Sequence, residues 1–581
     1  MKQKTTALLI LLYFLVLQCT AQINPYNYHS QKKVVCTNGA VVSAHPLASK
    51  VGVQILKQGG NAFDAVIATQ LALAVVYPGA GNIGGGGFLV AHLRNGKNIA
   101  LDYREKAPAK ATRDMYLDSA GNPQMQLSQD GHLAAGVPGT IAGLFATHKY
   151  AALPFAKLIQ PAIDMAENGF AVTASEAASL NHTKEEFVKL NTAPVAFVKN
   201  TPWKTGDTLI QKDLASTLKR IRDNGQKGFY SGETAKLIVE EMKSPYPLKG
   251  EIEKKEAKYG ELVKGIISLE DLENYQAKER RPDVFNYKGF TIVTMPLPSS
   301  GGIILQQMMK MIAKRNIATM KFQTAASVQL MTEVERRAFA DRAEFLGDPD
   351  FVKVPVKKLT SDAYLVERMK DYTTGKAGSS DVTKAGLIKE SEETTHLSIA
   401  DNKGNVVSVT TTLNGGYGSR TVVGGAGFIL NNEMDDFSVK PGVPNMYGAV
   451  GNEKNAIAPG KRMLSSMTPT IVLKNNKPYL VVGTPGGTSI PTSVYQTLVN
   501  ILEFGMSATD AVNKPKFHHQ WLPDEILVEK DFDAGVKKQL EAMGYKVKVR
   551  GQIGRTEVIQ IKGKQIIAVG DKRGDDDAEG Y

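Results

Sequence analysis

Cysteine is nearly absent from this chain, which has 2 Cys among 581 residues. So few cysteines exclude a disulfide-stabilised scaffold and a cysteine-rich metal site. The chain also lacks an HExxH motif and any Cys/His spacing typical of zinc sites. The adjacent His518 and His519 would point in different directions on a strand or a helix, so we expect them to be structural. The sequence therefore predicts no metal site.

Long apolar runs and compact basic tracts are missing as well. The run Ala7–Leu17 is too short to cross a bilayer, which takes roughly 20 residues. A second run, Ala65–Val76, is interrupted by Thr69 and Gln70 and is typical of a buried helix. We expect no transmembrane segment in the mature protein. Lys and Arg number 70 against 58 for Asp and Glu, a formal net charge of +12. No compact basic tract accompanies this excess, so nucleic-acid binding is not supported.

The chain begins with the pattern of a leader. A basic start is followed by the short apolar run and by small residues up to Ala21, the order typical of a secretory signal peptide. We predict that residues 1–21 are removed and that the protein is exported, to a periplasm or beyond. Lipid attachment at Cys19 is an alternative, which Gln18 disfavours because lipoprotein processing prefers a small residue there. Loss of the leader would leave Cys36 alone, without an intramolecular disulfide.

The rest of the chain alternates between helical and extended patterns. Asn38-Gly39 is a turn signal between the apolar segments 34–36 and 40–43, which predicts a hairpin. No Lys-Ser/Thr pair follows Gly84–Gly87, which favours close backbone packing over a phosphate loop. Other predicted elements are helices over Pro46–Lys57, from the cap Asn61 to Val76 and over Pro491–Phe504, and strands over Phe88–His92, Thr394–Ala400, Asn405–Leu413, Thr470–Lys474 and Tyr479–Gly483. The middle third, about 140 to 390, is more helical. Helices, then strands, then helices predict an α/β/β/α layered body.

One polar segment runs directly into a predicted buried strand, with hydroxyl groups at the junction Glu393-Thr394. A Thr hydroxyl is a poor nucleophile at neutral pH unless a base lies beside it. If the peptide bond before Thr394 were cut, the new α-amino group, with a pKa of about 8, would be such a base. The residues alone leave a second interpretation open, in which Thr394 and Thr395 are ordinary strand residues.

A set of motifs in fixed order along the mature chain bears on this choice. Together they resemble the γ-glutamyltranspeptidase (glutathione hydrolase) family of N-terminal-nucleophile hydrolases. The motifs are Ala62–Ala65, Gly84–Phe88, Asp102–Glu105, Gly136–Gly139, Pro298–Gly302, Glu393–His396, Asn431–Phe437, Leu464–Thr470, Gly483–Gly487 and Phe517–Gln520. A single glycine-rich loop would be weak evidence, whereas this ordered set is highly specific.

The resemblance implies an α+β fold of four layers, αββα, that forms one large unit from two autoprocessed subunits. The precursor would cut itself between Glu393 and Thr394. The products would be a large subunit, residues 22–393, and a small subunit, residues 394–581, which remain together as a heterodimer.

The resemblance also implies the catalytic groups. Thr394 would be the nucleophile of both the self-cleavage and the catalysed reaction, with its freed amino group as the general base. Thr412 would hydrogen-bond that amino group. The backbone N–H groups of Gly486 and Gly487 would form the oxyanion hole, where one donor is typically worth about 3 kcal/mol. No metal and no organic cofactor are implied.

A γ-glutamyl donor carries an α-carboxylate and an α-ammonium, and the resemblance implies partners for both. A guanidinium offers two parallel donors to a carboxylate, which suits Arg104. The other implied binding residues are Ser465 and Ser466 for the carboxylate, Asn414, Glu433 and Asp436 for the ammonium, and Tyr447, in the lid loop Pro441–Gly448, as a shield against water. Glu433 stands where some relatives carry Gln, a change that keeps an acceptor and adds negative charge.

The implied activity is γ-glutamyl transfer and glutathione hydrolysis. Thr394 would attack the γ-amide of glutathione or another γ-glutamyl compound, and water, an amino acid or a dipeptide would take the group. One alternative is an acylase of glutaryl-cephalosporin amides, which lack the α-ammonium that Glu433 and Asp436 would bind. A second is an inactive exported binding protein, which the presence of both threonines and the amino-acid pocket disfavours. Glu393 occupies a variable position of the family, and nothing about it blocks cleavage.

Overall fold

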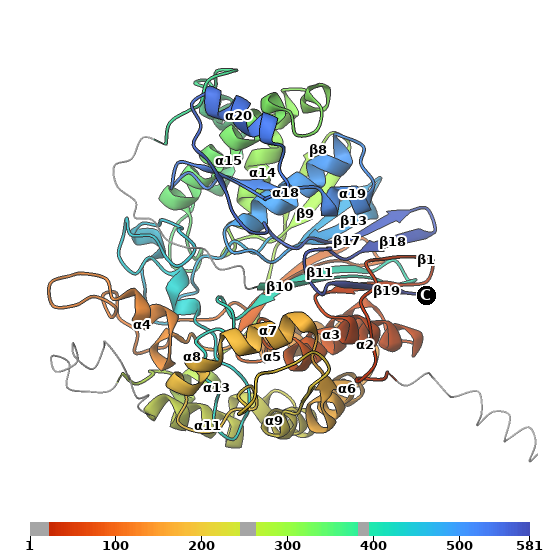
Figure 1. The fold of residues 1–581 in the computed structure, drawn as a ribbon, viewed down its shortest axis with the longest axis vertical. Coiled ribbons are helices and arrows are strands. Elements are labelled where there is room, and N and C mark those ends of the chain that lie inside the picture. Colours follow the sequence, from red (N-terminus) through yellow and green to blue (C-terminus); the bar gives the residue numbers. More distant parts are fainter. Residues whose placement is uncertain (1–22, 245–262, 381–393) are drawn as a thin grey trace, which may run out of the picture.

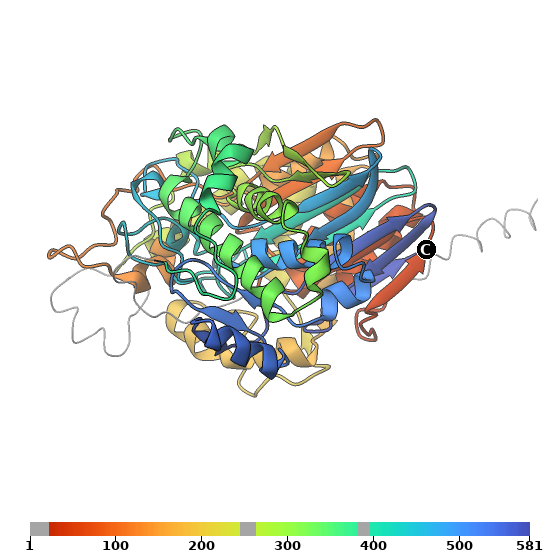
Figure 2. The ribbon, with the colours of Figure 1, turned by 90° about the horizontal axis from the view of Figure 1, so that it is seen from above.

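Two β-sheets lie face to face at the centre of the molecule, and helices cover their outer faces (Figure 1). This computed structural model describes residues 23–244, 263–380 and 394–581. The predicted leader with its cut after Ala21, and Glu393 at the predicted self-cleavage junction, lie outside the described residues. Viewed from above, the helices of one layer lie over the strands of the sheet beneath them (Figure 2).

The first sheet has β10 and β11 near its centre, and every neighbouring pair in it is antiparallel. Its strands in spatial order are β19 (Asp577–Gly580), β2 (Ala40–Ser43), β10 (Thr394–Ala400), β11 (Val406–Thr412), β3 (Gly86–His92), β4 (Asn98–Asp102) and β7 (Lys278–Arg280). The chain before residue 394 thus supplies the neighbours β2 and β3 on the two sides of the β10–β11 pair. The two predicted subunits share this sheet.

The second sheet is likewise antiparallel and shared. Its strands in spatial order are β1 (Lys33–Cys36), β18 (Gln565–Val569), β17 (Glu557–Lys562), β13 (Lys477–Gly483), β12 (Thr470–Lys474), β9 (Phe290–Thr294) and β8 (Asp283–Tyr287). Short strands elsewhere are β5 (Phe170–Ala171), β6 (Thr208–Leu209), β14 (Phe517–His518), β15 (Ile526–Val528) and β16 (Val547–Val549).

Helices form the two outer layers. The layer beneath the first sheet in Figure 1 contains α2 (Pro46–Lys57), α3 (Ala62–Val76), α5 (Thr140–His148), α6 (Phe155–Asn168), α7 (Ala174–His182), α8 (Lys184–Leu190), α9 (Lys212–Asn224), α10 (Lys227–Tyr230), α11 (Gly232–Lys243) and α13 (Leu269–Glu273). The layer on the second sheet contains α14 (Gly301–Ala313), α15 (Ala325–Phe345), α16 (Val356–Leu359), α17 (Asp362–Arg368), α18 (Ser489–Leu502), α19 (Ala508–Asn513) and α20 (Ala534–Ala542).

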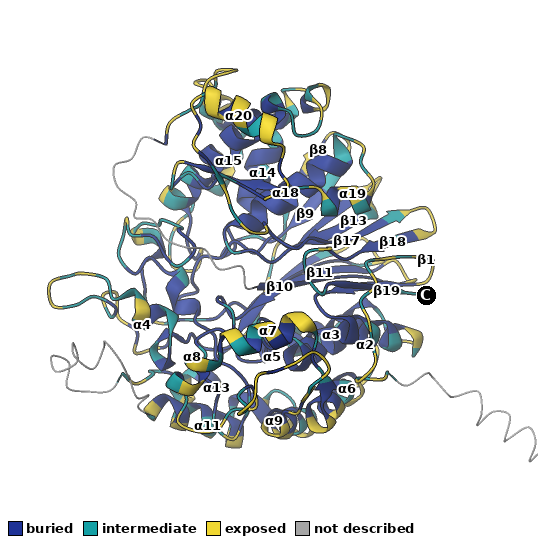
Figure 3. Ribbon diagram, in the orientation of Figure 1, coloured by how far each residue is buried: buried dark blue, intermediate teal, exposed yellow. Residues whose placement is uncertain are grey.

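Three apolar cores separate these four layers. Successive side chains of a strand point to opposite faces of its sheet. Leu397 and Ile399 of β10 accordingly join the core against the first helical layer, whereas Ala400 joins the core between the sheets. A third core lies between the second sheet and its helices. Strands are buried, and exposed residues gather on the outer helices and loop tips (Figure 3). Among the described residues, no helix has the length and apolar character that a bilayer crossing would need.

The helix predicted after Asn61 is present as α3, and it is buried along its whole length. Asn61 Oδ1 accepts from the N–H groups of Phe63 and Asp64, and the Asp64 carboxylate accepts from the Asn61 N–H. This reciprocal pair satisfies the first free donors of the helix. The predicted helix Pro46–Lys57 is also confirmed, as are the strands predicted over Thr470–Lys474 and Tyr479–Gly483, which pair as β12 and β13.

The hairpin predicted around Asn38-Gly39 is wrong. β1 pairs with β18 in one sheet, and β2 pairs with β10 and β19 in the other. The turn carries the chain across from one sheet to the next, and the Asn38 N–H donates to Tyr581 O instead of to a facing strand. Distant strands therefore compete successfully with the local pairing. The middle third, predicted to be more helical, also supplies the strands β7, β8 and β9.

Glycines in the run Gly84–Gly87 allow the close packing that the sequence predicts. A Cβ on Gly85 would lie 2.1 Å from Thr412 O, and one on Gly87 would lie 2.6 Å from Thr410 O. No side chain fits at such distances, so these positions require glycine. The run thereby lets β3 and its preceding loop press against the end of β11.

Candidate active site

The pairing of β10 with β11 sets Thr394, the first residue of one strand, opposite Thr412, the last of the other. The next pair on the same face, His396 and Thr410, is joined by a 2.9 Å hydrogen bond between Nδ1 and Oγ1. Because residues two apart share a face, Thr394 and Thr412 face the second sheet. The Asn414 N–H donates to Thr412 Oγ1 at 2.7 Å, which fixes the hydroxyl at the strand end.

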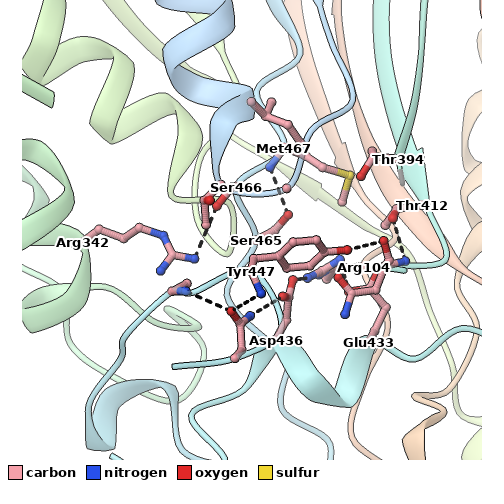
Figure 4. A pocket seen from close by; sticks show the side chains of 16 residues that line it. Arg104, Arg342, Thr394, Thr412, Glu433, Asp436, Tyr447, Ser465, Ser466 and Met467 are labelled. Carbon is pink, nitrogen blue, oxygen red and sulfur yellow. Dashed lines mark hydrogen bonds and ion pairs between the residues drawn. The ribbon is translucent and has the colours of Figure 1, made fainter. Parts of the chain in front are cut away.

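A small polar pocket lies beside this end of the strands (Figure 4). Its free volume is about 20 Å³, close to the space that one water molecule needs. Ten of the eleven predicted site residues line it, namely Arg104, Thr394, Thr412, Asn414, Glu433, Asp436, Tyr447, Ser465, Ser466 and Gly487. The eleventh, Gly486, precedes Gly487. The structure thus gathers all the predicted residues at one place.

Arg104 lies at this pocket, 1% exposed, between carboxylates from a distant segment. Its Nη1 is 2.5 Å from Glu433 Oε2, and its Nη2 donates to Asp436 Oδ2. Glu433 and Asp436 are three apart on a short 3₁₀ helix, η3 (Glu433–Asp436), where side chains at that spacing eclipse each other. The Glu105 carboxylate is farther away, 3.7 Å from Nη1. Arg104 Nε donates to Met463 O at 3.4 Å. Every nitrogen of the guanidinium therefore has a partner in the protein.

Burial controls the protonation of these acids. It raises the pKa of Glu433 well above its usual range and that of Glu105 to about 8, although the Arg104 charge lowers both. Burial also raises the pKa of Asp436. For Arg104 burial lowers the pKa, but the charges of Glu433 and Asp436 outweigh it and raise the pKa above its usual value. Glu105 is farthest from the guanidinium, and its oxygens have no hydrogen-bond partner among the described residues. In this coupled cluster the geometry therefore favours a proton on Glu105 over one on the two acids that contact Arg104.

Two serine hydroxyls line the pocket from the loop before β12. Ser465 Oγ accepts from the Met467 N–H at 3.1 Å, and Ser466 Oγ accepts from Arg342 Nη2 at 3.4 Å. Among the described residues, neither hydroxyl has an acceptor for its own hydrogen. The pair can therefore donate to a ligand.

Gly486 and Gly487 lead into α18 with φ angles of +135° and +51°, which side-chain-bearing residues rarely adopt. Within the described chain, their N–H groups donate to no other residue. They stand just before the N-terminus of a 14-residue helix, where the helix dipole favours negative charge. Two free donors at a helix start suit a developing oxyanion.

The segment Pro441–Gly448 covers the pocket. The Tyr447 hydroxyl donates to Asn414 O, and its ring packs on Gly487, where a Cβ would lie 2.6 Å from ring carbon Cδ1. The Tyr447 N–H donates to Asn445 Oδ1 at 3.0 Å, and Asn445 Nδ2 donates to Asp436 Oδ1 at 3.0 Å. This covering segment is therefore attached to the same acid that holds Arg104.

The histidine pair lies behind this segment. His518 Nδ1 is 2.8 Å from Thr492 Oγ1, and His518 Nε2 is 2.9 Å from Gln520 Oε1. Burial lowers the pKa of His518 to about 3, so its ring is neutral. Gln520 Nε2 in turn donates to Tyr447 O at 3.2 Å. In the part of the chain that the structure describes, no three His, Cys, Asp or Glu side chains gather as a metal site would require.

Three polar lining residues were not assigned a role by the sequence analysis: Arg342, Asn445 and Thr488. Asn445 lies inside the predicted lid loop, so the sequence analysis included its segment. Only the fold shows that its side chain hydrogen-bonds to Asp436. Thr488 directly follows the predicted glycine pair. Arg342 lies in α15, a helix whose many charged residues are typical of a solvated face, and no motif marks it.

Comparison with known proteins gives consistent matches over almost the whole chain. A sequence model of the family described as Gamma-glutamyltranspeptidase matches residues 48–581. The glutathione hydrolase proenzyme of Escherichia coli (strain K12) is 45% identical over 528 residues, which are 90% of this chain and 88% of that protein.

Solved structures match as well. The cephalosporin acylase from Bacillus halodurans superposes with a TM-score of 0.80 at 26% identity, over 96% of this chain and 99% of that one. The Helicobacter pylori gamma-glutamyltranspeptidase matches with a TM-score of 0.53 at 42% identity, over 61% of this chain and 94% of that one. The predicted α+β fold, the four-layer αββα architecture of N-terminal-nucleophile hydrolases, is confirmed.

Replacing Glu105 by Gln should change the stability in a pH-dependent way. The folded carboxyl has a pKa of about 8, whereas an unfolded Glu titrates at about 4.3. Between these values the folded protein holds a proton that the unfolded chain releases. The contribution of the protonated Glu105 to the free energy of unfolding is therefore complete below about pH 4. It is lost as the pH rises toward about 8, by up to about 1.4 kcal/mol per pH unit.

The Gln side chain does not titrate, so Glu105→Gln should gain stability relative to the wild type across this interval. Urea unfolding of both proteins at about pH 5 and about pH 8 measures the difference. A free-energy difference that is the same at both pH values would show that Glu105 is ionised in the folded protein.

Proposed function

The chain belongs to the gamma-glutamyltranspeptidase family and is an enzyme, and we propose that it acts as a γ-glutamyltransferase and glutathione hydrolase. The observation that carries the proposal is the buried pairing of Arg104 with Glu433 and Asp436 in the pocket that Thr394 lines. One cation beside two carboxylates matches an amino acid, which brings one charge of each sign. The reactive threonine then lies within the same pocket as the amino-acid end of the donor.

The donor would bind by exchanging ion-pair partners with the protein. The groups proposed for the α-carboxylate are Arg104, Ser465 and Ser466, and those for the α-ammonium are Asn414, Glu433 and Asp436. Because the donor adds one positive and one negative charge, the net charge of the buried cluster does not change. No charge is left unpaired in the interior, where that would cost several kcal/mol. The small free volume means that lining side chains must move aside for the donor to enter.

The proposed reaction proceeds through an ester of Thr394. Its hydroxyl attacks the γ-amide carbonyl while its own α-amino group, hydrogen-bonded by Thr412, takes the proton and passes it to the leaving amine. With glutathione the leaving group is cysteinylglycine. The oxyanion forms against the N–H groups of Gly486 and Gly487. Water then releases glutamate, or an amino acid or dipeptide accepts the γ-glutamyl group.

The same threonine would carry out the maturation of the chain. Cleavage between Glu393 and Thr394 gives a large subunit, residues 22–393, and a small one, residues 394–581. The name of the Escherichia coli relative, a proenzyme, supports this step. Both sheets contain strands from both parts, so the parts remain together without a covalent link. Removal of residues 1–21 and export, to a periplasm or beyond, complete the proposed maturation.

A glutaryl amide acylase is the competing function, because the Bacillus halodurans cephalosporin acylase has this fold. A glutaryl group presents a carboxylate but no ammonium. Its entry would draw Arg104 away from Glu433 and Asp436 without replacing the positive charge. An uncompensated buried charge costs about 3–5 kcal/mol, so these two acids favour a γ-glutamyl donor.

Thr394→Ala should give an uncut and inactive protein, because it removes the attacking hydroxyl of both reactions. The wild type should appear on a denaturing gel as fragments of about 40 and about 20 kDa, in proportion to their share of 62.9 kDa. Thr395→Ala is the matched control. The Thr395 side chain faces the helical side of β10, and Oγ1 has no hydrogen-bond partner among the described residues. A cut Thr394→Ala chain would exclude Thr394 as the nucleophile.

Three anilides test the substrate class. The γ-glutamyl anilide carries both charges, the glutaryl anilide lacks the ammonium, and the 4-aminobutyryl anilide lacks the carboxylate. We expect kcat/KM for the γ-glutamyl anilide to exceed the other two by at least about a hundredfold, since a site that pairs polar groups rejects analogues that lack them. Faster turnover of the glutaryl anilide would establish an acylase instead. If the self-cleaved protein turned over none of the three anilides, the result would favour a binding protein.

A further inference from the structure

The helix α15 brings a second arginine to the pocket wall (Figure 4). Arg342 is 7% exposed, and its Nε donates to Ser300 Oγ at 3.1 Å while its Nη2 donates to Ser466 Oγ at 3.4 Å. Among the described residues, no carboxylate forms an ion pair with it. Burial lowers its pKa to about 10, which still leaves it protonated at neutral pH. Arg104 contacts two carboxylates directly, whereas Arg342 lies near Asp436, whose charge raises its pKa, without forming an ion pair with it.

Ser300 extends the contact of Arg342 to Ser465. Ser300 Oγ donates to Ser465 O at 2.7 Å, and the Ser300 N–H donates to the same carbonyl at 2.8 Å. A single guanidinium therefore holds the main chain of Ser465 and the side chain of Ser466. Its planar fork makes this double contact possible, whereas a lysine ammonium is a single point of charge.

These contacts determine which groups the Ser465 and Ser466 hydroxyls can donate to. Ser465 Oγ already accepts from Met467, and Ser466 Oγ accepts from Arg342. Each hydroxyl has one hydrogen to donate, and the described chain offers no acceptor for either. Both hydrogens are thus available to a group inside the pocket. Two donors with a cation behind them that forms no ion pair with a described residue favour an anion.

We propose that Arg342 is a positioning residue for the α-carboxylate of the donor. It orients Ser465 and Ser466 as donors and adds positive charge on their side of the pocket. The inference rests on the proposed function and extends it, because Arg104 is already paired with Glu433 and Asp436. Arg342 then supplies the attraction that draws the carboxylate in before Arg104 changes partners.

Arg342→Met should lower kcat/KM about tenfold to a hundredfold for the γ-glutamyl and glutaryl anilides, mainly through KM, because both carry the carboxylate. The 4-aminobutyryl anilide lacks it, so its turnover should stay within about twofold. Inhibition constants for glutamate, glutarate and 4-aminobutyrate report the same pattern where turnover is slow. If the wild type fails on the γ-glutamyl anilide, the proposed function is wrong, whatever the variant does.

Arg337→Lys is the matched control, because Arg337 is buried on the same helix but pairs with Glu333 and Asp371 away from the pocket. It should affect all three anilides equally. In a Ser466→Ala background, Arg342→Met should cost clearly less than it does alone, since the two residues act together. An equal loss on all three anilides, or full additivity with Ser466→Ala, would show that Arg342 is merely structural.

A separate observation concerns the opposite end of the two sheets. Strand β10 runs from Thr394 at the pocket to the turn at Asp401, about 20 Å away by the rise of a strand. There the β10–β11, β12–β13 and β17–β18 turns line a cleft of about 1170 Å³. The neighbouring Asn38 N–H bonds to Tyr581 O, so the cleft is on the side of the C-terminus (Figure 1).

The cleft is strongly basic. The positively charged residues that line it are Arg94, Lys403, Lys474, Lys477, Lys562 and Lys564. All six are exposed, and none forms an ion pair with a described residue. The one carboxylate in the lining, Asp401, is buried and accepts from the N–H groups of Ala62, Lys403 and Asn405. Six positive charges thus face one negative charge that is already engaged.

We propose that this cleft binds a linear anionic polysaccharide. The five lysines act as separate point charges, which suits charged groups spaced along a flexible chain. The amides of Asn38, Asn402, Asn475 and Asn476 also line the cleft and can both donate to and accept from sugar hydroxyls. The half-buried Tyr479 ring adds an apolar surface. A concave cleft cannot lie flush against a flat bilayer, which disfavours an anionic membrane.

The test uses polygalacturonate as the probe and two quadruple variants with the same change in net charge. The cleft variant carries Lys→Gln at 474, 477, 562 and 564, and the control carries Lys→Gln at 157, 212, 236 and 538, which are exposed elsewhere. The wild type should bind at physiological salt and lose affinity as salt rises. The cleft variant should bind polygalacturonate at least about tenfold more weakly than the wild type, and the control should bind within about twofold of it. Both variants should turn over the γ-glutamyl anilide at the wild-type rate.

Three results would overturn this proposal. Equal losses in the two variants would mean that net charge alone drives binding. Tighter cleft-dependent binding of polyglutamate or of vesicles of anionic lipid would identify a different partner. An absence of any binding by the wild type at physiological salt would mean that the lysines are simply solvated.

Discussion

A buried guanidinium requires carboxylates around it, and this requirement organises the pocket. Arg104 follows β4, whereas Glu433 and Asp436 follow β11, so the ion pairs join two distant segments. Loss of either side would leave a buried charge at a cost of about 3–5 kcal/mol. Through Asn445, the covering segment with Tyr447 depends on the same cluster. The position of the covering segment and the contact between these two distant segments therefore depend on the same ion pairs.

The position of Thr394, the proposed nucleophile, depends on a second constraint, which is how closely the backbone can pack at the strand ends. A Cβ on Gly483 would lie 2.1 Å from His396 Cε1, and the His396 ring hydrogen-bonds to Thr410 on the same face as Thr394. Gly85 makes the corresponding approach to Thr412. These glycines belong to motifs that are visible in the sequence. The motifs are informative because the geometry of the site leaves no other residue for those positions.

Local signals predicted much of the fold, and long-range packing produced the rest. The capped helix α3 and the strand β10 follow from patterns within about 15 neighbouring residues. The Asn38-Gly39 turn failed as a hairpin because its flanking strands find better partners far along the chain. The resemblance supplied the predicted site residues, whereas Arg342 carried no signal of its own. Its importance arises only where α15 meets Ser300 and Ser466.

The distribution of charge is a second property that arises from long-range packing and that local sequence patterns do not reveal. The excess of basic residues has no compact tract in the sequence, yet part of it gathers in the cleft from four separate segments. Physiological salt screens exposed charges over about 8 Å, and β10 separates the cleft from Thr394 by about 20 Å. The cleft therefore contributes little to the pocket, and the raised pKa of Glu105 has local causes, burial opposed by Arg104. Each end of the strands can bind its own anion because the two charge distributions are electrostatically independent.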